Sequence, residues 1–523
     1  MSDPVAPSPS APATPQPRRP YWLPVPWILG LAAIIVLVLR QIHHISEQHF
    51  IMNVGRVVIG TLAALLIWLL GPSRLRWRTR GLVLVAFIAL IGLGGLCFRI
   101  RGVSGNLIPL IEFRWAPDSA SLHYSLNPTR ATSVTIPSAA DFPQFLGPNR
   151  DGVLLTPRLA TNWSTTTPRL LWRQKLGTAW SGFAVSGALA VTQEQRGQDE
   201  MVTGYDLNTG QMVWAHSVST RYFTTLAGEG PRATPSIGGG RVFAVGATGR
   251  LTCLDLAQGQ EIWTKDILSE NKVGVPSWGH SSSPLLYKDW VIVNAGGHHD
   301  RALIAYRSSD GKLAWNGGNE GSTYSSPLPT QIAGVEQILL FGDSLAGHDA
   351  TTGKVLWQFP WPGGHPHVST PIRVGGSDVI LSSGYGTGAG RVSVKQNAAG
   401  QWEATPVWRS NRMKAKFTNL IVHRGFLYGL DDGILACLDV ETGILRWKDG
   451  KYGHGQVLLV GDLLLLLAES GEIVLVDPNP EGLRELSRFE VLQGKTWNPP
   501  AMAGELLVVR NDKEAACYRL PVR

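Results

Sequence analysis

Eight side chains suited to holding an anionic or planar group recur between residues 180 and 497 of this 523-residue chain. Each lies one to three positions before an apolar run, and the eight are Trp180, Arg232, His280, Tyr324, His367, Lys416, His454 and Trp497. Cations make charge-assisted hydrogen bonds to anions, and aromatic rings stack on planar groups. If the runs that follow them converge in space, the eight residues form one ring-shaped binding site.

A simpler interpretation competes with this one. The residues that precede strands belong to loops, and loops are polar and varied in any protein. Asp and Glu are absent from the eight positions, so a quinone-like carboxylate suits the ring better than a metal ion. We predict no catalytic residue and no metal ligand. The sequence favours the simpler interpretation and keeps the ring as a candidate site.

The apolar runs belong to a repeated hairpin that would position these side chains. Its cleanest copies place Asp, or Arg in one case, eight residues before Trp, as in Asp206 to Trp214, Asp255 to Trp263, Arg307 to Trp315, Asp349 to Trp357 and Asp439 to Trp447. Gly210 supplies the positive φ of a tight turn, and Asp206 can accept hydrogen bonds from the turn's N–H groups. The Trp offers a flat surface and an indole N–H to the next repeat.

Each repeat holds about four strands, because Ser or Thr beside Pro opens another apolar run ahead of the hairpin, as at Thr234-Pro235. Four-stranded repeats of this length, without a helical period, predict propeller blades. Trp172 has no Asp strand before it and Arg519 has no Trp strand after it, so the first strand should complete the last blade. We predict an all-β, eight-bladed β-propeller over residues 141–523.

The first 140 residues are of a different kind. Residues 1–20 are rich in Pro, Ala and Ser and predict a disordered tail. Three apolar segments of nearly bilayer-spanning length follow, at Pro24–Leu39, Val57–Leu70 and Leu82–Phe98. Residues 21–101 therefore predict a membrane anchor of three transmembrane helices, and residues 102–140 a linker.

Arginine sets the expected orientation of this anchor. Arg18 and Arg19 precede the first apolar segment, and Arg74, Arg76, Arg78 and Arg80 crowd the region between the second and the third. The positive-inside rule places both regions in the cytoplasm and everything after residue 101 on the far side. We expect the bacterial inner (cytoplasmic) membrane, with the propeller in the periplasm.

The net charge of +8 belongs to the anchor. Residues 1–101 contain ten Arg and no Lys against Asp3 and Glu47, and the remaining 37 basic and 37 acidic residues balance. The propeller region thus gives no indication of nucleic-acid binding. Three of the four cysteines share one position in their repeats, which indicates packing rather than disulfides.

The stretch from Asp206 to Trp214, DLNTGQMVW, resembles the Trp-docking repeat of the pyrroloquinoline quinone (PQQ) propeller superfamily, and the resemblance covers residues 140–523. It implies a quinoprotein-like, PQQ-binding-like β-propeller. This superfamily contains quinoprotein alcohol and glucose dehydrogenases, in which PQQ is used with calcium, and noncatalytic BamB-like scaffolds. The resemblance therefore implies the fold and leaves two functions open.

We expect a noncatalytic binding or scaffold module for periplasmic protein or envelope partners, with no cofactor. The chain lacks the adjacent Cys pair that the resemblance associates with the alcohol dehydrogenases, and about 44 residues per blade leave little room for inserted loops. The alternative is a PQQ-dependent membrane quinoprotein dehydrogenase, which would use PQQ and calcium, oxidise alcohols or sugars and pass electrons to ubiquinone.

Overall fold

The computed structural model describes residues 21–42, 47–116, 141–297 and 299–523. The predicted tail at residues 1–20 and most of the predicted linker, residues 117–140, lie outside this part. The chain divides into two compact units, Met1–Ile100 with Asn106–Trp115, and Arg101–Gly105 with Ala116–Arg523.

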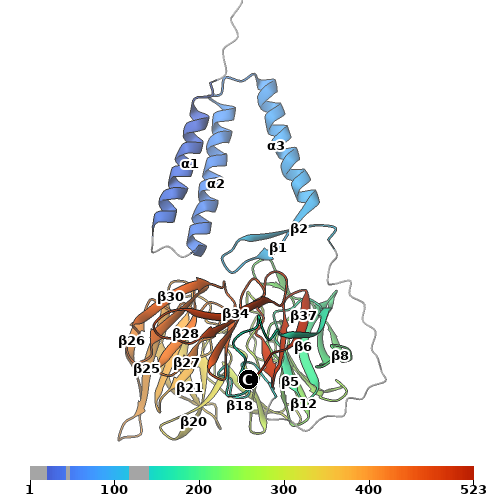
Figure 1. The fold of residues 1–523 in the computed structure, drawn as a ribbon, viewed down its shortest axis with the longest axis vertical. Helices are drawn as coiled ribbons and strands as arrows, with labels where there is room; N and C mark the ends of the chain where they lie inside the picture. Colours follow the sequence, from blue (N-terminus) through green and yellow to red (C-terminus); the bar gives the residue numbers. More distant parts are fainter. Residues whose placement is uncertain (1–20, 43–46, 117–140, 298) are drawn as a thin grey trace, which may run out of the picture. The chain divides into compact units, whose positions relative to one another are not determined.

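Three apolar helices dominate the first unit, α1 (Pro24–Gln41), α2 (Glu47–Leu70) and α3 (Trp77–Cys97) (Figure 1). Each is long and apolar enough to cross a membrane, with mean hydropathies of 1.8, 2.0 and 2.2. The chain continues into a two-stranded sheet of β1 (Phe98–Val103) and β2 (Pro109–Phe113).

Helices α2 and α3 begin earlier than the apolar segments indicate, at Glu47 and Trp77. Arg78 and Arg80 therefore lie in the first turn of α3 rather than in a loop. The Arg80 guanidinium donates to the carbonyl oxygens of Leu70 and Gly71, which are left without helical partners at the end of α2. A polar N-terminal turn thus extends α3 beyond its apolar sequence.

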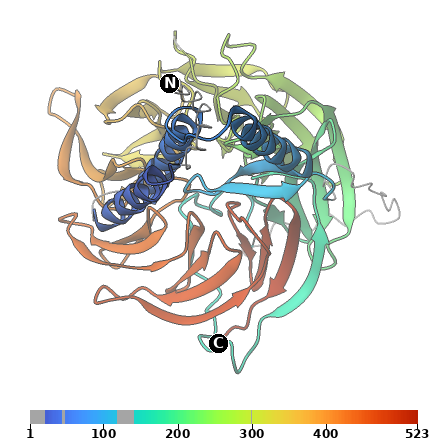
Figure 2. The same ribbon diagram turned by 90° about the horizontal axis from the view of Figure 1, so that it is seen from above.

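Eight antiparallel sheets make up the second unit, and they form the predicted eight-bladed propeller (Figure 2). Blades 1 to 4 comprise β5 (Ala184–Ser186), β6 (Leu189–Arg196), β7 (Asp199–Asp206) and β8 (Met212–Ser219); β11 (Ser236–Gly238), β12 (Arg241–Val245), β13 (Arg250–Asp255) and β14 (Glu261–Asp266); β15 (Leu285–Tyr287), β16 (Trp290–Asn294), β17 (Leu303–Arg307) and β18 (Leu313–Gly317); and β19 (Leu328–Ile332), β20 (Val335–Phe341), β21 (Ser344–Asp349) and β22 (Val355–Pro360).

Blades 5 to 8 follow the same pattern, except that blade 7 has one added strand, β3, and the fourth strand of blade 8, β4, comes from before blade 1. They comprise β23 (Ile372–Val374), β24 (Asp378–Ser383), β25 (Gly388–Gln396) and β26 (Trp402–Ser410); β27 (Ile421–His423), β28 (Phe426–Asp431), β29 (Ile434–Asp439) and β30 (Leu445–Lys451); β31 (Gln456–Val460), β32 (Leu463–Leu467), β33 (Glu472–Asp477) and β34 (Arg484–Glu490), with β3 (Val153–Leu154) beside β31; and β35 (Ala501–Ala503), β36 (Leu506–Arg510), β37 (Glu514–Arg519) and β4 (Arg169–Lys175). A short hairpin of β9 (Phe223–Thr224) and β10 (Gly228–Glu229) lies between blades 1 and 2.

The repeated Trp joins several blades to the next by one recurring contact. The indole N–H of Trp214 donates to the carbonyl of Leu256 in blade 2 at 3.0 Å, and that of Trp263 to Ser308 in blade 3 at 3.0 Å. The ring also covers the turn Gly of the following blade: a Cβ on Gly259 would lie 2.4 Å from the Trp214 ring. Trp408 and Trp447 make the same hydrogen bond. The Trp therefore docks blade on blade, as the sequence predicts.

Strand β4 closes the ring by completing blade 8, which confirms the predicted pairing of the two ends. Trp172 lies opposite Cys517, and Arg169 opposite Arg519. In Figure 1 the red strand β37 and the green strand β6 of blade 1 lie near each other. The pairing covers the edge of β37, which would otherwise be open.

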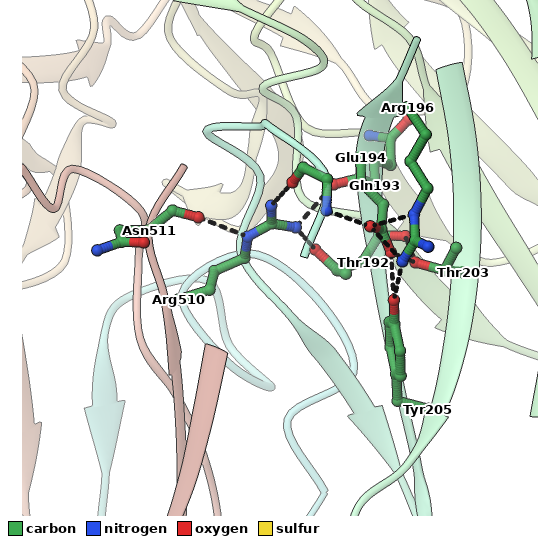
Figure 3. Close-up of polar contacts among 9 residues, drawn as sticks. Thr192, Gln193, Glu194, Arg196, Thr203, Tyr205, Arg510 and Asn511 are labelled. Carbon is green, nitrogen blue, oxygen red and sulfur yellow. Dashed lines mark hydrogen bonds and ion pairs between the residues drawn. The ribbon is translucent and has the colours of Figure 1, made fainter. Parts of the chain in front are cut away.

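A buried polar network strengthens the contact between blades 8 and 1 (Figure 3). The Arg510 guanidinium, on β36, donates to the carbonyl of Gly177 at 2.8 Å, and the Glu194 carboxylate, on β6, accepts the N–H of the same Gly177 at 2.6 Å. Arg196 forms an ion pair with Glu194 at 2.9 Å, and both groups contact the Tyr205 hydroxyl. One glycine peptide is thus held by opposite charges from the two blades.

The segment Asp141–Leu154 connects several blades before the ring begins. Phe142 pairs with Val185 of blade 1, and the fully buried Arg150 donates to the carbonyls of Ser283 and Pro284 in the lead to blade 3. Val153 pairs with Leu459 of blade 7. Because blades 1, 3 and 7 lie on different sides of the ring, this segment crosses the propeller centre.

The shared Cys position lies in the core. Cys253, Cys437 and Cys517 are free and fully buried, and burial raises the pKa of each thiol above its ordinary value, to about 12 for Cys253. These residues therefore act as small packing groups.

Candidate binding site at the mouth of the propeller channel

The eight predicted residues all lie in the loops that lead into the innermost strands β5, β11, β15, β19, β23, β27, β31 and β35. Those loops surround one end of the central channel, which we call the mouth. The structure therefore brings the eight loops to one end of the propeller, but their side chains behave differently from one another.

Five of the eight belong to one connected group of side chains. Trp180 and Trp497 have ring centroids 5.0 Å apart, and Trp497 contacts Phe417, whose ring lies 5.4 Å from that of His454. The Lys416 ammonium lies 5.5 Å from the Tyr385 ring, and Tyr324 lies 5.7 Å from Trp278. We call this group the mouth cluster: Trp180, Trp278, Tyr324, Tyr385, Lys416, Phe417, His454, Lys495 and Trp497.

Contacts within the mouth cluster cross the channel. Trp278 precedes blade 3 and Phe417 precedes blade 6, yet their rings lie 6.3 Å apart. Trp278 also lies 6.3 Å from Tyr385, which sits between β24 and β25 of blade 5. Rings from blades that are not neighbours can meet only at the centre, so aromatic side chains narrow the channel here.

The other three predicted residues take part in local structure. Buried His280 donates to the carbonyl of Asn294 in its own blade 3 at 2.7 Å. Buried His367, which leads into blade 5, donates to the carbonyl of Gly342 in blade 4 at 2.5 Å. Arg232 donates to carbonyls of its own loop, including that of Ala227 at 2.8 Å, and its guanidinium lies over the Tyr222 ring. The His367 carbonyl accepts the backbone N–H of Tyr324 at 3.2 Å, but these three side chains engage local partners.

A segment of the chain itself lies on the mouth cluster. Arg101–Gly105, which we call the strap, belongs to the same compact unit as the propeller. The Gly105 N–H donates to Glu469 at 2.8 Å, and the Lys416 ammonium donates to the Gly105 carbonyl at 3.4 Å. The Lys495 ammonium donates to the Val103 carbonyl at 3.0 Å. Arg101 forms an ion pair with Asp512 at 3.3 Å.

Burial changes the pKa values of the ionisable groups beneath the strap. It lowers the pKa of Lys495 to about 8, and it lowers the pKa of Lys416 below its ordinary value. Burial, and then the positive charge of Lys416, lower the pKa of His454, so this ring is neutral at pH 7. Burial opposes ionisation of Glu469, but N–H donors from Gly105 and His454 outweigh it and lower the pKa of that carboxyl. The mouth thus holds one carboxylate, bound by N–H groups, near two buried amines.

Sequence reasoning did not find Lys495, Phe417, Trp278, Tyr385 or Glu469. Lys495 lies between two indoles, 4.4 Å from Trp180 and 4.1 Å from Trp497, in a cation–π arrangement. Phe417 and Lys495 are neighbours of predicted positions, and could have been found by widening the search by two residues. Glu469 and Tyr385 follow second strands of their blades, a position that the repeat does not mark.

These groups do not fit PQQ with calcium. Calcium requires six to eight oxygen ligands, mostly carboxylates and carbonyls. The oxygens of Glu469 already accept N–H groups from Gly105, His454 and Trp497, at 2.8 to 2.9 Å. Among the described residues, no three His, Cys, Asp or Glu side chains gather as a metal site would need. The geometry suits a polypeptide backbone, which offers both N–H and C=O groups.

Fold and mouth together define an eight-bladed, PQQ-like β-propeller with four-stranded, Trp-docked blades. Residues 152–278 and 198–449 match the family described as outer membrane protein assembly factor BamB, and these ranges cover more than half of the chain. The chain belongs to this family.

Individual relatives are distant. The BamB of Marinobacter adhaerens is 28% identical over 151 residues, 28% of this chain and 33% of the relative. The BamB of Shewanella oneidensis is 25% identical over 296 residues, 53% of this chain and 71% of the relative. The chain therefore spans a third of one relative and somewhat over two thirds of the other.

Solved structures support the fold without selecting a function. The BamB of Moraxella catarrhalis superposes with a TM-score of 0.50 at 15% identity, covering 68% of this chain and 98% of that one. A europium-containing methanol dehydrogenase superposes with a TM-score of 0.55 at 12% identity, covering 73% and 98%. A family member and an enzyme thus resemble this propeller about equally.

Proposed function

We propose that this protein is a noncatalytic β-propeller, anchored in the inner membrane by α1, α2 and α3, that binds protein partners in the periplasm. The observation that carries this proposal is the set of contacts at the mouth, where Glu469, Lys416 and Lys495 engage backbone groups of a polypeptide. Membership of a family named for outer membrane protein assembly supports a protein partner.

The distribution of arginines supports the periplasmic side. Arg74 and Arg76 lie between α2 and α3, and Arg78 and Arg80 lie in the first turn of α3. The positive-inside rule counts residues close to the ends of a span, so all four favour the cytoplasm. A chain that crosses the membrane three times then has its propeller in the periplasm.

Fusions test the location. Alkaline phosphatase is active only in the periplasm and green fluorescent protein fluoresces after folding in the cytoplasm, so each is joined in turn after Arg523. We expect phosphatase activity and no fluorescence. The same reporters joined after Ser73 should give the opposite result. A fluorescent fusion after Arg523 would place the propeller in the cytoplasm and contradict the proposal.

The absence of catalysis is tested against the alternative, a PQQ-dependent dehydrogenase, which the resemblance to the methanol dehydrogenase structure favours. Full-length protein in nanodiscs is mixed with PQQ and either calcium or a lanthanide, then assayed by dye reduction with alcohols and sugars. We expect no reduction above a protein-free control and no saturable PQQ binding. Turnover that depends on PQQ would establish the enzyme and overturn the noncatalytic function.

A further inference from the structure

The strap is held through its backbone. Glu469 accepts the N–H of Gly105, Lys416 donates to the C=O of the same residue, and Lys495 donates to the C=O of Val103. Every polypeptide carries such N–H and C=O groups, so these three contacts do not depend on the strap's side chains.

The position of Gly105 in the strap nevertheless excludes residues that carry a side chain. A Cβ on Gly105 would lie 2.0 Å from Cδ2 of His454, which is fully buried. Gly102 is looser, because a Cβ there would lie 3.6 Å from the nearest atom, the Thr225 carbonyl oxygen. The mouth therefore accepts Gly at the place of residue 105 and tolerates a side chain at the place of residue 102.

The mouth contains a hydrogen-bond acceptor, Glu469, and two donors, Lys416 and Lys495. Its occupant must therefore offer both N–H and C=O groups. Lys416 is 2% exposed beneath the strap, and burial disfavours its charged form. An amine or carboxylate in such a place is stabilised by hydrogen bonds that replace its water. A purely apolar ligand would leave Glu469, Lys416 and Lys495 without these partners, whereas a strand end followed by a turn, as in the strap, satisfies all three.

We propose that the mouth is a general binding site for a polypeptide segment with a glycine in a turn, and that the strap is an exchangeable resident of it. A partner's segment binds when it replaces Gly102–Gly105 and presents a glycine to His454. This inference rests on the proposed function and names the chemistry of the partner: an unfolded or loop segment read by its backbone.

The covalent link between the strap and the propeller makes the strap a competitor of any free segment. The strap is part of the same chain as the propeller, which follows it in the sequence, so it competes for the mouth at an effective concentration of about 1 mM. A free segment therefore has to compete with the strap. Weakening the strap should strengthen binding of the free segment without any change in the mouth itself.

The test uses the full chain in nanodiscs and a fluorescent ten-residue peptide with the sequence of residues 99–108. We expect wild-type protein to bind it weakly and Gly105→Leu to bind it at least tenfold more tightly, measured by fluorescence anisotropy. Arg101→Ala, which removes the ion pair with Asp512 and leaves the mouth intact, should give about a threefold gain. The double variant Gly105→Leu/Glu469→Ala should lose the gain.

Matched controls separate exchange from unfolding and from nonspecific binding. Gly364→Leu introduces the same side chain at a glycine with no atom within 4 Å of its Cβ, and it should bind like the wild type. A peptide with N-methylglycine at the place of Gly105 lacks the N–H that Glu469 accepts, and it should bind Gly105→Leu at least tenfold more weakly.

Two results would overturn the inference: equal binding by wild type, Arg101→Ala and a thermally stable Gly105→Leu, or binding that ignores the N-methyl group. The fusion and dye-reduction assays do not involve the peptide, so they report on the proposed function independently. If they give the expected results while the peptide fails to bind, exchange alone is disproved.

Discussion

The indole N–H of Trp172 donates to the carbonyl of Leu207 at 2.8 Å, although Trp172 belongs to blade 8 and Leu207 follows the third strand of blade 1. This is the contact that Trp214 makes with Leu256 between blades 1 and 2. The ring is therefore closed by the same contact that joins its internal blades, and the closing position can be tested against them.

Replacing Trp172 with Phe should destabilise the propeller by about 1 to 3 kcal/mol, because the buried Leu207 carbonyl loses its donor and the indole is shortened. Trp315→Phe is the matched control, since its indole N–H has no hydrogen-bond partner among the described residues. Denaturant unfolding followed by tryptophan fluorescence would compare the two. Equal losses would mean that the hydrogen bond contributes nothing to closure.

Glu194→Gln should cost about 3 kcal/mol or more, because it removes the negative charge that acts on the buried Arg510 and pairs with the partly buried Arg196. Glu336→Gln removes an exposed ion pair with Lys288 and should cost at most about 1 kcal/mol. Denaturant unfolding at pH 7 is the measurement. A cost as small as that of Glu336→Gln would show that the charge of Glu194 is dispensable.

The contribution of Glu194 should also depend on pH. Burial raises the pKa of its carboxyl, but the charges of Arg196 and Arg510 outweigh burial and hold that pKa below its ordinary value of 4.5. The unfolded chain therefore takes up the proton first as pH falls. The stability difference between wild type and Glu194→Gln should be full above pH 4.5 and shrink below it. A difference that stays constant down to pH 3 would contradict this.

Glu200 should produce the opposite dependence. Burial raises the pKa of its carboxyl from 4.5 to about 7, despite the N–H that it accepts from Ala247. The folded protein then holds a proton that the unfolded chain releases, so stability falls as pH rises from 4.5 to 7, by at most about 3 kcal/mol. Glu200→Gln should match wild type near pH 4.5 and exceed it at pH 8. Denaturant unfolding at four pH values is the measurement. If the two proteins change in stability with pH by the same amount, the prediction is wrong.

Replacing Arg74, Arg76 and Arg78 with Ala should reduce the activity of alkaline phosphatase fused after Arg523 several-fold, because fewer positive charges then hold the region between α2 and α3 in the cytoplasm. Arg80 is retained because it caps the end of α2. The same replacement of Arg169, Arg241 and Arg424 in the propeller serves as the control and should leave phosphatase activity unchanged. Unchanged activity in both variants would remove the charge argument for orientation.

The sequence was sufficient to predict the ring because the Trp-docking contact repeats. Trp172 and Arg519 are incomplete halves of a known unit, and their pairing follows from that unit alone. Where the unit is modified, prediction fails: the indole N–H of Trp357 donates to Gln337 of its own blade rather than to the next blade. A short motif identifies the ring position of a Trp, but not every partner of its N–H.

The sequence predicts where the mouth lies, but not which side chains form the mouth cluster. His280 and Trp497 occupy equivalent places before innermost strands, yet a carbonyl at the end of β16 draws the His280 ring away from the cluster. Glu469 and the strap meet across 364 residues of sequence. Such a contact leaves no periodic signal, since nothing in the repeat refers to a segment outside it.

The crossing segment Asp141–Leu154 has a mechanical consequence. Tension that passes the strap along the chain from the N-terminal side reaches this segment before β4. The segment is bound to blades 1 and 7 by strand pairs and to the lead of blade 3 through Arg150, so the load is divided among several blades. The closing strand that holds the ring together is thereby shielded from being peeled away when the protein is pulled.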